Sequence, residues 1–150
     1  MEYFDQILEG PAKYVLIFMV AVVIIYIPIM IVYMKKKKKK ATDYLSLHPE
    51  AAHVFIIHRK KGFVSDHLAI HTVNDGYPET FIKEGKNGFF LLPGKNKLEV
   101  SYSWTRPGVL YKNVTTEVPV SIQTVTVEPG KSYEISYDTK EETYCFEERA

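Results

Sequence analysis

The longest apolar stretch of the chain covers residues 14–34, YVLIFMVAVVIIYIPIMIVYM, and contains no charged or strongly polar side chain. A helix of this length spans about 31 Å at ~1.5 Å per residue, close to the ~30 Å hydrocarbon core of a bilayer. A helix in a soluble core would carry a polar stripe, and this stretch has none. One isolated apolar segment also cannot close a barrel. The pattern therefore predicts a transmembrane helix over residues 13–34.

Beyond residue 50 the pattern changes to short alternating or β-branched runs, separated by Gly, Pro, Asn and Asp. The clearest run is residues 97–105, KLEVSYSWT, in which Leu98, Val100, Tyr102 and Trp104 share one face. The predicted strands cover residues 52–59, 67–73, 79–83, 89–92, 97–105, 114–122, 124–127, 132–137 and 143–146. Seven to nine short strands with turns at near-regular spacing predict an all-β domain, an antiparallel β-sandwich.

Two details of this sandwich follow from the same pattern. Residues 124–127 and 132–137 flank the Pro129-Gly130 turn, so we expect them to form a hairpin whose apolar side chains face one core. These side chains are Val125, Val127, Tyr133, Ile135 and Tyr137. Pro119 cannot donate a backbone hydrogen bond, which predicts an edge or bulge position for it.

The chain therefore divides into four predicted parts. Residues 1–12 form a short extracytoplasmic tail, residues 13–34 the transmembrane helix, residues 35–50 a polybasic flank and linker, and residues 51–150 the β-sandwich domain. Within the flank, residues 41–50 are polar and we expect a short connector, because Pro49 blocks a helix from continuing.

Charge beside the apolar stretch predicts its orientation. Six consecutive lysines follow it, Lys35, Lys36, Lys37, Lys38, Lys39 and Lys40, whereas Lys13 is the single base before it. Basic residues near a span stay on the cytoplasmic side. We therefore expect a single-pass protein of the cell membrane with its N-terminus outside and its C-terminal domain in the cytoplasm. The single cysteine, Cys145, agrees with a reducing compartment.

Two alternative interpretations concern the same region. A cleaved secretory signal would need a basic start, a shorter apolar core and a small-x-small cleavage site, whereas residues 1–10 carry three acids and no base. We therefore expect the segment to be retained. The lysine run could bind anionic lipid headgroups, worth about 1 kcal/mol per base near the surface. A topology signal without a regulated role explains the run more simply.

The charge of the domain argues against nucleic acid as a partner. Residues 41–150 contain 12 Lys and Arg against 15 Asp and Glu, so the positive charge of the chain is concentrated in the lysine run. A folded part without a basic surplus lacks the electrostatic footprint of a nucleic-acid-binding surface.

Two stretches resemble the PEGA-type family of small β-sandwich domains and related prealbumin-like modules. They are residues 90–100, FLLPGKNKLEV, and residues 127–133, VEPGKSY; Asn74-Asp75-Gly76 is similar to an earlier Asp-Gly turn of the family. The resemblance covers about residues 65–138, and Asn96 stands where the family more often has His or Tyr. It implies a binding or structural module without catalytic residues, of a kind often found on membrane-bound proteins.

Motifs for catalysis and metal binding are incomplete. Gly130-Lys131-Ser132 is similar to the end of a phosphate-binding loop, but Val125 stands where that loop needs Gly. Ser65-Asp66-His67 is contiguous, and chain neighbours rarely form a triad. Five histidines, namely His48, His53, His58, His67 and His71, raise a metal hypothesis if the strands that carry them lie side by side. Zinc would need three or four converging ligands. We expect no catalytic residue, metal or cofactor.

Three functions remain open. We favour a non-enzymatic interaction or scaffolding protein, an accessory subunit of a larger membrane complex that contacts the bilayer through the lysine run. The alternative is a module on the extracytoplasmic side that binds a carbohydrate-like ligand through Tyr102, Trp104 or Tyr111, because aromatic rings suit such contacts. A metal-dependent enzyme that uses the histidines or Asp66 is the third.

Overall fold

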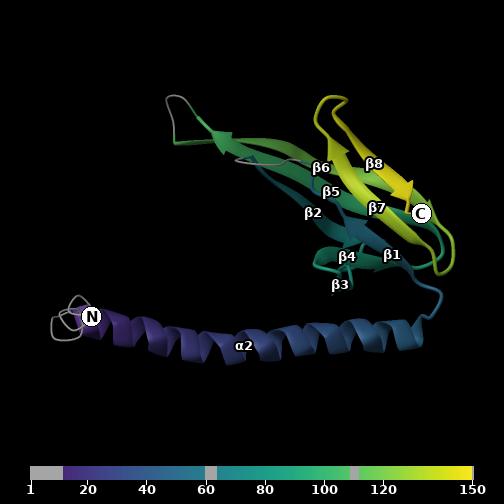
Figure 1. The fold of residues 1–150 in the computed structure, drawn as a ribbon. Helices are drawn as coiled ribbons and strands as arrows, with labels where there is room; N and C mark the ends of the chain where they lie inside the picture. Colours follow the sequence, from purple (N-terminus) through teal and green to yellow (C-terminus); the bar gives the residue numbers. More distant parts are fainter. Residues whose placement is uncertain (1–11, 60–63, 109–111, 150) are drawn as a thin grey trace. The chain divides into compact units, whose positions relative to one another are not determined.

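The computed structural model describes residues 12–59, 64–108 and 112–149 (Figure 1). One helix, α2 (Ala12–Leu47), precedes eight strands, and the boundary between two compact units of the chain falls between Lys39 and Lys40. Every residue from 14 to 34 is exposed within its unit. The helix is long and apolar enough to cross a membrane, with a mean hydropathy of 3.2 in its most apolar part. The prediction of one apolar N-terminal helix before an all-β part is confirmed.

The helix does not end at the lysine run. It continues to Leu47, so the connector that we expected over residues 41–50 is wrong for most of its length. The reason is tertiary packing within the second unit. Residues 41–47 belong to this unit, and one side of their helical segment lies on an aromatic cluster of the same unit. The packed residues, three and four apart, are Ala41, Tyr44 and Leu45. Pro49 lies two residues beyond the helix end, as expected of a helix stop.

The strands form two sheets. The five-stranded sheet has the order β3-β4-β1-β7-β8 and the three-stranded sheet the order β2-β5-β6. The strands are β1 (Ala52–Ile56), β2 (Ser65–Val73), β3 (Thr80–Lys83), β4 (Lys86–Leu91), β5 (Gly94–Pro107), β6 (Asn113–Val127), β7 (Ser132–Asp138) and β8 (Thr143–Glu148). Each predicted strand corresponds to one of these, except that residues 114–122 and 124–127 belong to the single strand β6.

Strand pairing corrects two predictions. The β1–β7 pair is parallel, so the expectation of wholly antiparallel sheets is wrong at this pair. The predicted hairpin around Pro129-Gly130 is also wrong, because β6 pairs with β5 whereas β7 pairs with β1 and β8. That turn instead carries the chain from one sheet to the other. Both errors have one cause, since alternation along a strand fixes its faces but not its neighbour.

Pro119 lies where the prediction placed it. β6 is one of the two edge strands of the three-stranded sheet, and its register against β5 shifts between Val100 and Tyr102. Val100 pairs with Ser121 and Tyr102 with Val118, so β6 has one extra residue there, at Pro119 and Val120. A bulge accommodates the missing N–H of proline without breaking a regular ladder.

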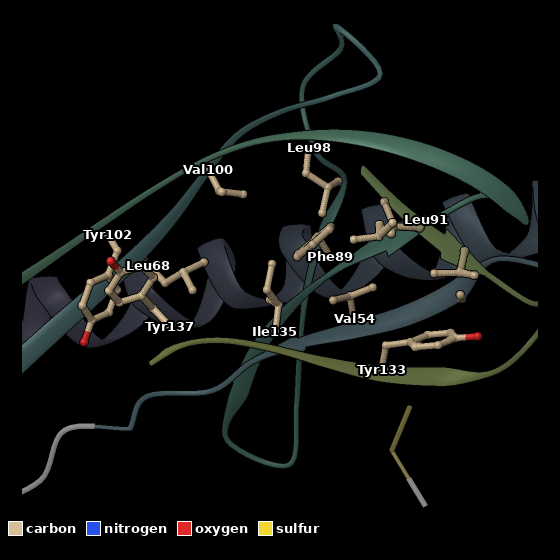
Figure 2. Packing of buried hydrophobic residues seen from close by; sticks show 13 residues of the cluster. Val54, Leu68, Phe89, Leu91, Leu98, Val100, Tyr102, Tyr133, Ile135 and Tyr137 are labelled. Atoms are coloured by element: carbon tan, nitrogen blue, oxygen red, sulfur yellow. The ribbon is translucent and has the colours of Figure 1, made fainter. Parts of the chain in front are cut away.

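The larger cluster of buried side chains draws on both sheets (Figure 2). Its members are Ala52, Val54, Phe89, Leu91, Tyr133, Ile135 and Tyr137 from the five-stranded sheet, and Leu68, Leu98, Val100, Tyr102, Val125 and Val127 from the three-stranded sheet. The predicted inward face of β5 is therefore confirmed, with Trp104 only partly buried at its end. The predicted common core of Val125 and Val127 with three β7 side chains is confirmed as well.

A second, smaller cluster surrounds Gly88 in the five-stranded sheet. Phe55, Phe81 and Phe90 are buried there, and Phe81 pairs directly across from Gly88. A Cβ atom on Gly88 would lie 2.4 Å from Cζ of Phe81 and 2.5 Å from the carbonyl oxygen of Val54. Only glycine leaves room for the ring of Phe81 on this strand.

Candidate functional site

One group of polar side chains lies where β1 ends. Ile57 continues the β1–β7 ladder, because its N–H donates to the carbonyl of Ile135 at 2.9 Å. This register carries the next two residues, His58 and Arg59, along the end of β7. We call the group formed by His58, Arg59, Asp66, Ser136 and Asp138 the β1-exit cluster.

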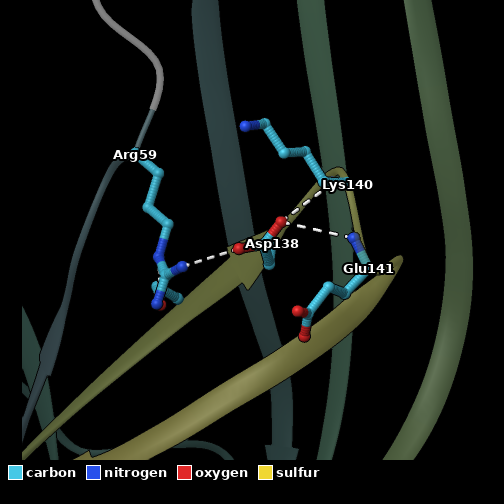
Figure 3. A network of polar contacts seen from close by, with 5 residues as sticks. Arg59, Asp138, Lys140 and Glu141 are labelled. Atoms are coloured by element: carbon cyan, nitrogen blue, oxygen red, sulfur yellow. Dashed lines mark hydrogen bonds and ion pairs between the residues drawn. The ribbon is translucent and has the colours of Figure 1, made fainter.

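The exposed half of the cluster is built on Asp138 (Figure 3). One carboxylate oxygen accepts a hydrogen bond from Nη1 of Arg59 at 2.9 Å, and the other accepts from the backbone N–H groups of Lys140 at 2.8 Å and Glu141 at 3.3 Å. These backbone bonds and, to a lesser degree, the Arg59 charge lower the pKa of Asp138. Nε of Arg59 donates to Oγ of Ser136 at 3.0 Å. Asp138 therefore fixes both the β7–β8 turn and Arg59.

The buried half of the cluster is built on Asp66. Its side chain is 5% exposed, and Oδ1 lies 3.1 Å from Nδ1 of His58. The hydroxyl of Tyr102 donates to Oδ2 at 3.0 Å. Burial raises the pKa of Tyr102, and the hydrogen bond to Asp66 raises it further. The carboxylate thus joins a half-exposed imidazole to a buried phenol.

The contiguous run Ser65-Asp66-His67 does not supply the imidazole that contacts Asp66. Successive residues of a strand point to opposite faces, so Asp66 and His67 diverge. In β2, Asp66 and Leu68 are more buried than His67 between them. The imidazole that meets Asp66 comes from His58, which lies eight residues earlier.

The three predicted ligand contacts have different outcomes. Tyr102 is 2% exposed, so it is a core residue and the idea of a direct surface contact is wrong for it. Trp104 is partly buried, with its ring centroid 5.7 Å from that of Tyr102. Tyr111 lies outside the described residues.

The five histidines do not come together as the metal hypothesis requires. β1, which carries His53, and β2, which carries His67 and His71, lie in different sheets, so the expected neighbouring strands are wrong. His71 Nε2 lies 2.8 Å from Oγ of Ser101 on the three-stranded sheet. Over residues 12–59, 64–108 and 112–149, no group of three or more His, Cys, Asp or Glu side chains could hold a metal ion.

His53 lies in the smaller aromatic cluster. Its ring makes edge contacts with Phe81 and Phe90, at centroid distances of 5.3 Å and 5.1 Å. Burial lowers the pKa of His53, and the charge of Lys83 adds to this effect. Tyr44 stacks on Phe90 at 5.3 Å. This cluster has the character of a helix–sheet packing contact.

The six lysines of the run all lie in helix α2. Successive helical residues are rotated by about 100°, so six in a row surround the helix with positive charge. Like charges three and four residues apart repel each other and disfavour the helix. Anions near residues 35–40 would therefore stabilise the helix, because they reduce the repulsion among the lysines.

Sequence reasoning missed most of the β1-exit cluster. Arg59, Ser136 and Asp138 carry no local motif, and they meet only because β1 and β7 pair in parallel. Around Asp66 the sequence shows only the contiguous run Ser65-Asp66-His67. The alternation of Asp66 with Leu68 and Ile70 does indicate a special role for Asp66, because a charged residue on the core-facing side of a strand needs a buried partner.

Comparisons with protein-family models, with curated proteins and with solved structures gave no significant match.

Proposed function

We propose that the chain is a single-pass, membrane-anchored, non-enzymatic interaction protein, an accessory subunit of a larger membrane complex. One observation carries the proposal: an uncharged stretch of 21 residues runs directly into six lysines and then into an all-β domain. In this proposal the two sheets form a β-sandwich of the PEGA-like kind that the sequence resembles. The sandwich contacts another membrane protein.

The lysine run supports the orientation. Six bases on one side of the apolar stretch against one on the other favour an outside N-terminus and a cytoplasmic domain. Anionic headgroups of the cytoplasmic leaflet would then offset the repulsion among lysines in the helix. The excess of acidic residues in residues 41–150 keeps the domain itself from binding that surface.

Sidedness is the first test. Tyr77 is 95% exposed, so a Tyr77→Cys substitution in a Cys145→Ser background gives one accessible thiol on the domain. We expect a membrane-impermeant maleimide to label it only after intact cells are permeabilised. Labelling of intact cells would overturn the cytoplasmic assignment. The Cys145→Ser chain without the new cysteine is the matched control.

Partner binding is the second test. A pull-down of the full chain from membranes in mild detergent should return another membrane protein in a fixed ratio. Recovery of this chain alone would overturn the accessory-subunit role. Replacing residues 35–40 by glutamine should weaken binding to anionic vesicles and leave binding to neutral vesicles unchanged. Undiminished binding of this variant to anionic vesicles would contradict the headgroup contact.

A carbohydrate-binding module remains the second candidate, and one observation favours it. Trp104 is the only tryptophan of the chain, and it is partly exposed beside the residue pair Asp66 and Tyr102. An exposed indole ring near polar groups suits a sugar face. Trp104 fluorescence should then respond to one class of saccharide, and an unchanged spectrum across a saccharide panel would remove this candidate.

A further inference from the structure

Four aromatic rings form a continuous row through the domain. The centroid of Trp104 lies 5.7 Å from that of Tyr102, Tyr102 lies 4.5 Å from Tyr137, and Tyr137 lies 4.9 Å from Tyr144. Tyr102 and Tyr137 come from different sheets and meet in the core (Figure 2). The row therefore connects the partly exposed indole of Trp104 to two buried phenols, Tyr102 and Tyr137, and ends at the partly buried Tyr144. Electron transfer between oxidisable rings is fast over such separations.

Tyr102 in this row has a built-in proton acceptor. A phenol that loses one electron becomes a very strong acid, so its oxidation is easy only where a base can take the proton at once. The hydroxyl of Tyr102 donates to Oδ2 of Asp66 at 3.0 Å, and Asp66 is held on its other oxygen by His58 at 3.1 Å. Tyr102 is 2% exposed and the Asp66 side chain 5% exposed, so water does not supply that base. Packing of the core explains the aromatic ring of Tyr102 but does not explain the buried carboxylate of Asp66 beside its hydroxyl.

We propose that Trp104, Tyr102 and Asp66 form a one-electron oxidation relay, in which a small radical oxidant removes an electron at Trp104 and the hole moves inward to Tyr102. The substrate class is a one-electron oxidant in solution, for which the azide radical is a usable probe. This activity goes beyond the proposed interaction function and does not depend on it.

The azide radical takes one electron from Trp104 and becomes azide, while the indole nitrogen releases its proton to water. Tyr102 then gives one electron to the Trp104 radical, and its phenol proton moves to the Asp66 carboxylate. The indole nitrogen takes a proton back from water. The products are azide, intact Trp104, a neutral Tyr102 radical and a neutral Asp66 carboxylic acid.

Pulse radiolysis of the full chain in detergent tests the relay. Azide radicals oxidise tryptophan in preference to tyrosine, and the chain has one tryptophan. In the wild type, the tryptophanyl absorption should decay as the tyrosyl absorption grows, at one rate that does not depend on protein concentration. Tyr102→Phe should abolish this growth and leave a long-lived tryptophanyl radical. Identical kinetics in the wild type and this variant would overturn the proposal.

Two further variants separate the relay from a general change in structure. Asp66→Asn keeps an oxygen acceptor near Tyr102 but removes the base, so the transfer should slow and the tyrosyl yield should fall. Tyr77→Phe removes a tyrosine that is 95% exposed and outside the row, so its kinetics should match the wild type. Unchanged transfer in Asp66→Asn, or lost transfer in Tyr77→Phe, would also contradict the relay. An unchanged circular dichroism spectrum in each variant verifies the fold.

Discussion

Asp66 and Asp138 hold two consecutive residues, His58 and Arg59, in opposite ways. Asp66 is buried, and its partners are an imidazole and a phenol. The side chain of Asp138 is 26% exposed, and it accepts from a guanidinium and two backbone N–H groups. A buried carboxylate is costly unless every partner is in place, whereas an exposed one always has water as a substitute. The two halves of the β1-exit cluster should therefore respond very differently to substitution.

The largest expected effect comes from Asp66→Ala. This change leaves the buried hydroxyl of Tyr102 without its acceptor and releases His58, so we expect a loss of about 3 kcal/mol in the free energy of unfolding. Urea unfolding of the full chain in detergent, followed by Trp104 fluorescence, measures it.

Asp66→Asn is the matched control, because its side-chain carbonyl can still accept from Tyr102. It should recover part of the loss. Equal losses for the alanine and asparagine variants would show that the hydrogen bond to Tyr102 does not stabilise the fold.

A smaller effect is expected for Tyr102→Phe, which keeps the ring and removes the hydroxyl. We expect a loss of about 1.5 kcal/mol at neutral pH. The folded-state pKa of Tyr102 is raised above the ordinary value, so its stabilising contribution is complete below about pH 10 and is lost as the pH rises further. The wild type should therefore lose more stability between about pH 9 and pH 11 than the phenylalanine variant does.

Unfolding curves at several pH values measure this difference. Tyr77→Phe serves as the control, since Tyr77 is 95% exposed and its removal should leave the alkaline loss unchanged. Parallel pH profiles for the wild type and Tyr102→Phe would contradict the argument.

The comparison also shows what the sequence could reveal. The uncharged length of residues 14–34 and the alternation of residues 97–105 are local, so the apolar helix and the inward face of β5 followed from them directly. The partners of Asp66 and Asp138 depend on which strands pair. Arg59 reaches Asp138 through the parallel β1–β7 register, whereas His58 reaches Asp66 on β2, a strand of the other sheet. No local pattern specifies either neighbour.

The helical segment that ends at Leu47 is a second case in which a contact distant in the sequence decides the local structure. Its sequence is polar and lies before a proline, so the local pattern predicts a connector. The packing of Tyr44 on Phe90, 46 positions later in the chain, changes the result. Tertiary contacts override weak local preference in this segment.

Arg59→Lys should have a modest effect. Lysine keeps the positive charge but cannot donate to Ser136 and Asp138 together in the planar geometry of arginine. Because the Arg59 side chain is 40% exposed, we expect a loss of roughly 0.5 kcal/mol that shrinks at high salt. Urea unfolding at low and high salt measures it, and a loss as large as that of Asp66→Ala would abolish the distinction between the two halves.

The smallest effect is expected for Asp138→Asn, and acid reveals it. Backbone N–H groups and Arg59 lower the folded-state pKa of Asp138, so the stability it contributes is present above about pH 4 and is lost as the pH falls toward the folded value. The single oxygen of asparagine can still accept from the backbone of Lys140 and Glu141, so the variant loses the charge and the hydrogen bond from Arg59. The wild type should be slightly more stable than the variant at neutral pH, and the two should converge as the pH falls from about 4 to below the lowered folded-state pKa of Asp138. Thermal unfolding of both chains across this pH range measures the convergence. A stability difference that widens in acid would contradict the lowered folded-state pKa of Asp138.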